Sequence, residues 1–260
     1  MGVRPFLARV SNRLRVDAKR AELEVRRRRA GDDFFVDYDW IRLLYSGDGD
    51  YQEIAYHRNQ SQWHEKDMMV FRSLLAPGQT AIDVGANLGF VSTILASIVG
   101  QEGRVLSFEP SPTVYPKLLK TIEANDLTQI TPFNYGCGEV ASTEVLHTVS
   151  KSSGNSSIVA PGEATEIKVM RLDDVDEAQE TPVRLLKIDT EGYEPMVLRG
   201  APRFIEKHRP AIYLEMGGDY VDSTLESIQL LEDAGYDTAT VRDVDWSQVA
   251  NGSDYFFFPH

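Results

Sequence analysis

The sequence contains little cysteine and no long apolar run. Its single cysteine, Cys137, cannot form an intramolecular disulfide, so a reducing, cytoplasmic compartment is the simplest expectation. No stretch of about 18 apolar residues occurs, and a membrane-spanning segment is therefore not expected. His and Cys residues do not gather at zinc-site spacing, which argues against a zinc centre. Apolar residues make up 42% of the 260, enough to form a sizeable core.

Basic residues are scarce outside the first 30 positions. That leader holds 10 Lys and Arg against 3 Asp and Glu, a net charge of +7, whereas the whole chain carries −13. Because an acidic body repels phosphate, nucleic acid is not an expected partner. Residues 1–30 have apolar positions at helical spacing but lack the apolar core of a secretion signal, which predicts a basic amphipathic helix. This helix could lie on an anionic membrane, dock on an acidic surface of its own chain or of another subunit in a homo-oligomer, or be a solvated extension.

Strand-like and helix-like stretches alternate along most of the chain, which predicts a doubly wound, Rossmann-like α/β sheet. We expect a helical extension over residues 1–30, a short hairpin or two edge strands with a lid or helix segment over 31–78, and one domain over 79–260. Within that domain, strands replace helices at about residues 138–171, which predicts a β insertion. A final apolar strand after a helix-poor connection predicts an antiparallel last strand. The expected core elements are the strands Ala81–Val84, Arg104–Glu109, Ile130–Tyr135, Arg184–Ile188 and Ala211–Glu215, and a helix over Met196–His208.

The most informative stretch is Thr80–Gly89, TAIDVGANLG, in which an apolar run ends at Asp83 and a glycine-bracketed turn precedes a helical pattern. Dinucleotide sites use G-x-G-x-x-G around an anionic pyrophosphate. Here Asn87 stands where the middle glycine would be, and Asp83 would repel pyrophosphate. A cofactor with ammonium and sulfonium cations would instead be attracted, which favours S-adenosylmethionine (SAM). The alternative is a plain tight turn between a strand and a helix.

The stretch Leu185–Glu194, LLKIDTEGYE, is the second strong signal. Three carboxylates follow an apolar strand and repel one another unless protons, cations or hydrogen-bond donors intervene. This favours a general base, a metal, or contact with the cationic part of the cofactor, whereas the alternative is helix capping, for which Glu194 is best placed. The expected candidates for a catalytic base are, in order, Asp189, Glu191 and His64. No metal is required, but Mg²⁺, if present, would be held by Asp189, Glu191 and Glu215.

Together, these segments resemble the FkbM-type family of SAM-dependent methyltransferases over roughly Glu65 to Glu215. The residues that carry the resemblance are Glu65 ahead of LLAPG, Asp83–Gly89, Phe108-Glu109-Pro110, Ser156-Ser157, Arg171–Asp174, Lys187–Glu194, Arg209-Pro210 and Glu215. The resemblance implies a class I methyltransferase fold, SAM as cofactor, and O-methylation of a hydroxyl on a sugar, a glycan or a polyketide-like natural product. It does not cover the basic leader or Trp40–Gln62.

Chemistry and the resemblance together assign roles at the cofactor site. Glu109 should accept both ribose hydroxyls, because a carboxylate offers two acceptor oxygens. Asn134 is placed to meet the adenine. The residues expected near the methionyl end are Asp83, Gly85, Asn87 and Gly89, and the resemblance adds Glu65 and Pro110 to the cofactor-binding candidates.

Three other kinds of protein remain open. A dinucleotide-dependent oxidoreductase is disfavoured by the missing middle glycine, and a noncatalytic SAM-binding module by the acids of Asp189–Glu194. A peripheral membrane module would be organised by the basic leader. Acceptor specificity is expected in Trp40–Trp63, Ser150–Ala160 and Asp243–Ser253, where no motif identifies a ligand.

Overall fold

The computed structural model of the chain describes residues 33–38, 41–46, 70–148, 156–158, 163–215, 220–238 and 254–259. The predicted basic helix of residues 1–30 lies outside this described part, and so do His64 and Glu65. Between residues 31 and 78, the described part contains two short strands and a helical stretch at residues 70–74.

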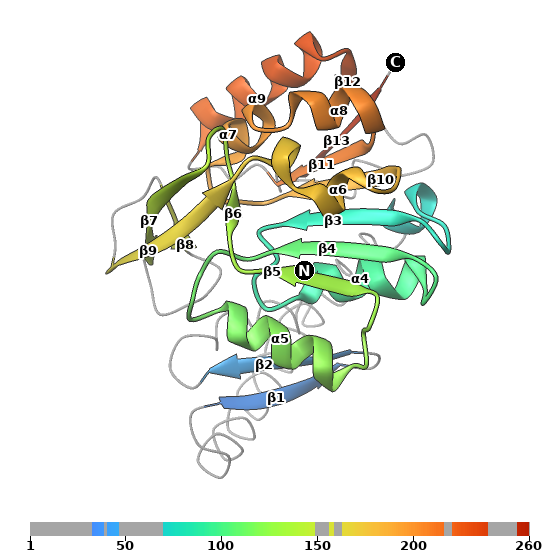
Figure 1. Cartoon of the computed structure of the whole chain (residues 1–260), viewed down its shortest axis with the longest axis vertical. Coiled ribbons are helices and arrows are strands. Elements are labelled where there is room, and N and C mark those ends of the chain that lie inside the picture. Colours follow the sequence, from blue (N-terminus) through green and yellow to red (C-terminus); the bar gives the residue numbers. More distant parts are fainter. Residues whose placement is uncertain are drawn as a thin grey trace, which may run out of the picture.

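A seven-stranded sheet forms the centre of the molecule, in the order β12-β13-β11-β10-β3-β4-β5 (Figure 1). Its strands are β3 (Thr80–Val84), β4 (Arg104–Phe108), β5 (Ile130–Phe133), β10 (Val183–Ile188), β11 (Ala211–Glu215), β12 (Tyr236–Thr238) and β13 (Asp254–Pro259). Neighbouring strands from β11 to β5 are parallel, whereas β13 runs antiparallel to both β11 and β12. The predicted doubly wound sheet with an antiparallel last strand is confirmed.

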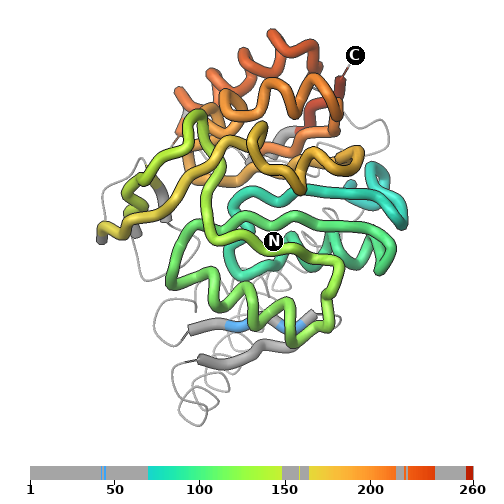
Figure 2. Tube along the Cα trace, in the orientation of Figure 1, coloured from blue at the N-terminus to red at the C-terminus, as the bar shows by residue number. Residues whose placement is uncertain are grey.

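The chain leaves β3, in the middle of the sheet, in two directions. It passes first to β4 and β5 on one side, and later to β10 and β11 on the other, so cyan and green strands lie on one side of Figure 2 and orange ones on the other. The boundary between β3 and β10 is therefore the topological switch point. Open α/β sheets bind their ligands there, beyond the carboxyl ends of the strands.

Helices cover both faces of the sheet because side chains alternate between the two faces along each strand. Ala81 and Leu185 pack with Ile94 of α4 (Phe90–Val99) and with the residue 70–74 stretch, and α5 (Tyr115–Ala124) joins the same face. Ile82 and Leu186 pack on the other face, against α7 (Glu194–Arg199), α8 (Pro202–His208) and α9 (Val221–Asp233). None of the helices in the described ranges is both long and apolar enough to cross a bilayer.

The prediction of one helix over Met196–His208 is wrong, because the structure divides this stretch into α7 and α8. Gly200 lies between them, and a Cβ atom at that position would come within 1.9 Å of the carbonyl oxygen of Gly138. Pro202 then begins α8, where its missing N–H forfeits no helical hydrogen bond. The break therefore accompanies a contact with a distant part of the chain.

A second sheet has the order β6-β9-β7-β8 and occupies the region where a β insertion is predicted. Its strands are β6 (Gly136–Cys137), β7 (Ser142–Thr148), β8 (Ser156–Ser157) and β9 (Glu163–Met170). Leu146, Ile167 and Val169 form a small core of its own. A Cβ atom on Gly138 would lie 3.1 Å from Cε1 of Tyr193, so the second sheet lies beside the turn that follows β10.

The strands β1 (Asp33–Tyr38) and β2 (Ile41–Ser46) form the hairpin that was one of the two predicted arrangements, and they dock on α5 (Figure 1). The backbone N–H of Arg42 donates to Oδ1 of Asn125 over 2.8 Å, and Nδ2 of Asn125 donates to the Arg42 carbonyl over 2.7 Å. Leu44 is buried, and its N–H donates to the Thr121 hydroxyl. This hairpin is therefore attached through α5 rather than through the central sheet.

Candidate functional site

The turn after β3 is built from residues in the left-handed conformation: φ is 79° at Gly85, 48° at Asn87 and 90° at Gly89. A Cβ atom on Gly85 would lie 1.8 Å from the Asp189 carbonyl oxygen, and one on Gly89 would lie 2.7 Å from a methyl group of Leu118. The sequence argument placed these glycines near the methionyl end of the cofactor. In the structure it is neighbouring protein atoms that leave no room for a side chain, and the cofactor contact of both glycines stays a prediction.

Glu109 directly follows β4 and is only 7% exposed. Its Oε2 accepts a hydrogen bond from the Asn87 N–H over 2.9 Å, and its Oε1 accepts one from the Ser111 N–H over 2.8 Å. Burial raises the pKa of Glu109 to about 7, although both backbone hydrogen bonds favour the charged form. Each carboxylate oxygen has a second lone pair. The arrangement therefore suits a bidentate acceptor for a pair of hydroxyl groups.

Asn134 and Pro110 lie at the same edge of the sheet as Glu109. Nδ2 of Asn134 donates to the Glu109 carbonyl over 3.0 Å and to the Pro110 carbonyl over 3.3 Å. The Asn134 side chain thus ties the end of β5 to the end of β4. Its predicted contact with adenine remains a prediction.

Asp83 is fully buried, with 0% of its surface exposed. Its Oδ2 accepts a hydrogen bond from the Ser92 hydroxyl over 2.6 Å, and its Oδ1 lies 3.0 Å from Nζ of Lys187. The sequence argument relied on a free Asp83 charge that attracts the cofactor cation. That argument needs correction, because Lys187 already offsets the charge of Asp83.

Asp189 immediately follows β10 and has 27% of its side chain exposed. Its Oδ2 lies 3.2 Å from Nζ of Lys187, and its N–H donates to the Val84 carbonyl. Asp83, Lys187 and Asp189 therefore form a chain of alternating charges across the switch point. Only Asp189, the last of the three, reaches solvent to an appreciable extent.

The other two acids of the turn differ from each other. Glu194 is buried, and its Oε1 accepts hydrogen bonds from the N–H and the hydroxyl of Thr190 and from the Gly192 N–H, while its Oε2 accepts one from Ser223. Glu194 is thus structural, as the sequence suggested, but it binds the amides of the turn before α7 and does not cap that helix. Glu191 is half-buried, and its φ of 53° is uncommon for a residue other than glycine.

Three predicted site residues cannot be placed fully: the base candidate His64, the cofactor-binding candidate Glu65 and the Mg²⁺-ligand candidate Glu215. His64 and Glu65 are not described, and Glu215 ends β11 without a described side chain. Within the described ranges, no three His, Cys, Asp or Glu side chains are grouped so that they could hold a metal ion. The Mg²⁺ version of the site therefore gains no support from this part of the chain.

Lys187 is the site residue that the sequence reasoning missed. It is 2% exposed, and its ammonium donates to the Gly85 carbonyl over 2.9 Å in addition to its two ion pairs. The available signal was a charged residue inside the apolar run LLKI, because a central parallel strand seldom carries a charge.

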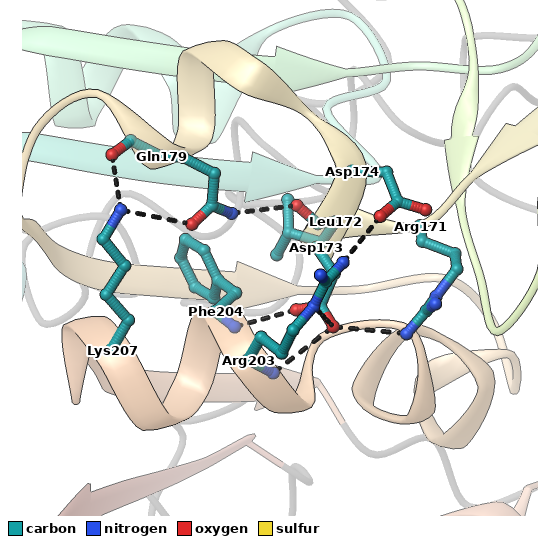
Figure 3. Close-up of polar contacts among 8 residues, drawn as sticks. All are labelled: Arg171, Leu172, Asp173, Asp174, Gln179, Arg203, Phe204 and Lys207. Carbon is teal, nitrogen blue, oxygen red and sulfur yellow. Dashed lines mark hydrogen bonds and ion pairs between the residues drawn. The ribbon is translucent and has the colours of Figure 1, made fainter.

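Arg171–Asp174, another segment of the resemblance, is structural (Figure 3). Oδ1 of Asp173 accepts a hydrogen bond from the Phe204 N–H over 2.8 Å, in the first turn of α8. Its Oδ2 contacts the guanidinium groups of Arg171 and Arg203, each at 3.2 Å. Asp173 therefore fastens the end of the second sheet to the start of α8.

The strand order and the acidic carboxyl-end site define a class I methyltransferase fold. A solved structure of a candidate rRNA methylase from Clostridium thermocellum is similar to the chain, with a TM-score of 0.50 and 14% sequence identity. The similarity covers 74% of this chain and 92% of that one. At this identity the likeness shows the fold alone.

Sequence comparison gives the family. Residues 83–238 match the family described as the methyltransferase FkbM domain, and the chain belongs to this family of SAM-dependent methyltransferases. It is 27% identical over 205 residues to methyltransferase sdnD of Sordaria araneosa, which covers 64% of this chain and 76% of that protein. It is 25% identical over 197 residues to methyltransferase 1 of Beauveria bassiana (strain ARSEF 2860), covering 64% and 75%.

The residues at the switch point fit SAM as the cofactor. Glu109 has a buried carboxylate, fixed by two backbone amides, that would accept the ribose hydroxyls. The turn from Gly85 to Gly89 would face the methionyl end, with Lys187 bound to the Gly85 carbonyl and paired with Asp83. When bound, SAM supplies a methyl group on a sulfonium sulfur, already activated for displacement.

Proposed function

We propose that this methyltransferase methylates a hydroxyl group of a sugar, a glycan or a polyketide-like natural product, with Asp189 as the general base. The observation that carries the proposal is the place of the Asp189 carboxylate. It follows β10 at the switch point, is 27% exposed, and has one oxygen held 3.2 Å from the Lys187 ammonium. It is thus accessible to an acceptor and yet fixed in position.

The chemistry requires such a group because a hydroxyl is a poor nucleophile until its proton leaves. In the proposed reaction the acceptor oxygen forms a bond to the methyl carbon, and the carbon–sulfur bond breaks with its electron pair remaining on sulfur. The hydroxyl proton passes to Asp189, which becomes neutral as the sulfonium charge disappears. The protein's remaining contribution is to align the two reactants and to exclude water.

Glu191 is the second candidate for the base. It lies two residues beyond Asp189, and its φ of 53° is followed by a φ of 98° at Gly192. Left-handed backbone at a non-glycine residue costs free energy and is concentrated at functional sites. A variant of Glu191 therefore belongs in the same experiment as one of Asp189.

A Mg²⁺-dependent version of the same transfer is the alternative. The Lys187 ammonium already lies 3.2 Å from Asp189, and its charge would repel a second cation at this place. Treatment with EDTA followed by metal add-back separates the two versions. We expect methyl transfer to be unaffected by chelation, and loss of activity that Mg²⁺ restores would favour the metal.

The proposal is tested by Asp189→Asn, assayed with methyl-labelled SAM and a panel of methyl glycosides and macrolide-like alcohols. We expect calorimetry to show little change in SAM affinity, and methyl transfer to fall by roughly 10²–10⁴-fold because the base is lost. Asp176→Asn, a matched change on the exposed first turn of α6 (Asp176–Gln179), is the control. Undiminished transfer by Asp189→Asn would remove the assignment. If the unchanged protein binds SAM tightly but methylates no acceptor of the panel, a noncatalytic SAM-binding module is favoured.

A further inference from the structure

Lys187 lies where a charge is least expected. It belongs to β10, a central parallel strand, and only 2% of its surface is exposed. An ammonium group removed from water destabilises the folded state unless charged and polar partners surround it. The partners of Lys187 therefore indicate why a lysine occupies this position.

Strand geometry explains which partners Lys187 meets. Side chains at i and i+2 of a strand share a face, so Lys187 and Asp189 point the same way. The parallel register places Lys187 directly opposite Asp83 on β3. The ammonium consequently reaches Asp83 at 3.0 Å and Asp189 at 3.2 Å, and it also donates to the Gly85 carbonyl at 2.9 Å. The Lys187 ammonium thus joins the ends of β3 and β10 to the turn Gly85–Gly89.

We propose that Lys187 is a positioning residue for methyl transfer. By holding Oδ2 of Asp189, it leaves Oδ1 as the oxygen that takes the acceptor proton, and by holding the Gly85 carbonyl it fixes the turn that faces SAM. Lys187 acts through these two groups and contacts neither the methyl group nor the acceptor. This inference rests on the proposed role of Asp189 as the base.

A purely structural lysine would have a different signature. If Lys187 served only to neutralise the buried Asp83, its loss would act on stability and leave the function of Asp189 intact. If it positions Asp189, the two residues form one unit, and removing both should harm transfer no more than removing the base alone. A double-mutant cycle distinguishes these cases.

The cycle consists of Lys187→Met, Asp189→Asn and the double variant, with Lys168→Met on the exposed surface of β9 as the matched control. The probes are SAM and its demethylated product in calorimetry, and methyl-labelled SAM with whichever alcohol of the panel the unchanged enzyme methylates. We expect Lys187→Met to lower kcat by at least about thirtyfold, with the double variant within about threefold of Asp189→Asn. SAM affinity should fall by roughly twofold to tenfold, because the Gly85 carbonyl loses a hydrogen-bond donor.

Each result supports or overturns the inference. Losses that multiply in the double variant, or normal kcat and SAM affinity in Lys187→Met, would overturn it while leaving the base assignment in place. Full activity of Asp189→Asn would overturn the base assignment and the inference together. If Lys187→Met does not fold, kcat is compared instead between Asp83→Asn and the double variant Asp83→Asn/Lys187→Met. The double variant should fold because removing both charges leaves no uncompensated ion in the core. Equal kcat in that pair would then count against Lys187.

Discussion

Glu109 is subject to two opposing influences. Burial withdraws water from its carboxyl group and raises its pKa from 4.5 to about 7, whereas the Ser111 and Asn87 amides stabilise the charged form. The effect of burial is the larger, so a fraction of the molecules holds a proton on Glu109 at neutral pH. Hydroxyl donors favour the ionised carboxylate. If Glu109 accepts the ribose hydroxyls as predicted, SAM binding is linked to release of a proton at this residue.

We expect the affinity for SAM to fall as the pH is lowered through about 7. Below the Glu109 pKa of about 7, ionised carboxylate becomes scarcer with each unit of pH, so Kd should rise by up to about tenfold per unit. Above the pKa the dependence should level off. Calorimetry on either side of the pKa, in two buffers of different ionisation enthalpy, measures both Kd and the protons released.

Glu109→Gln is the control for this linkage, because its side chain stays neutral at every pH. We expect its SAM affinity to be at least tenfold weaker above the Glu109 pKa, a loss of about 1.4 kcal/mol or more. Any titration of SAM itself is common to both proteins and cancels in the comparison. If the two proteins lose affinity in parallel as the pH falls, another group is responsible.

At the scale of elements, α8 depends on a side chain from outside the helix. Asp173 accepts the Phe204 N–H and contacts Arg171 and Arg203, as Figure 3 shows. Asp173→Ala would leave the first-turn amides of α8 without this acceptor. We expect the free energy of unfolding to fall by about 1–3 kcal/mol, measured by denaturant unfolding followed by circular dichroism.

Asp173→Asn separates the cap from the ion pairs. The amide keeps an acceptor oxygen for the Phe204 N–H but loses the charge that faces the two arginines. Because Arg203 is largely exposed, its ion pair should contribute little, and the Asn variant should lose less stability than the Ala variant. Equal losses in the Asn and Ala variants would contradict the capping account and assign the effect to charge.

The elements show where sequence reasoning succeeds. Strand ends were predicted closely because each depends on a local change, as at Asp83, where an apolar run gives way to a turn. The helix break at Gly200 and the burial of Lys187 were not predicted. Both depend on partners far away in the chain, the Gly138 carbonyl in one case and Asp83 in the other. Local patterns do not encode the register that brings such partners together.

At the scale of the whole molecule, the site is made by segments that only the folded chain brings together. Glu109 follows β4, the turn Gly85–Gly89 follows β3, and Asp189 follows β10. The unfolded chain has no such constellation, so a ligand of this site binds the folded state alone and raises its stability. The molecule should therefore report its cofactor through its unfolding temperature.

We expect SAM and its demethylated product to raise the midpoint of thermal unfolding, whereas NAD should not. At a ligand concentration about 100 times Kd, the stabilisation is about 2.7 kcal/mol. For a chain of this size, each kcal/mol raises the midpoint by roughly 2–4 °C, so a shift of several degrees should be visible by fluorimetry or calorimetry. Glu109→Ala should reduce the shift at the same SAM concentration, because the ribose hydroxyls lose their acceptor. A shift with NAD but not with SAM would instead restore the dinucleotide interpretation, for which the pairing of Asp83 with Lys187 would have removed the expected repulsion of pyrophosphate.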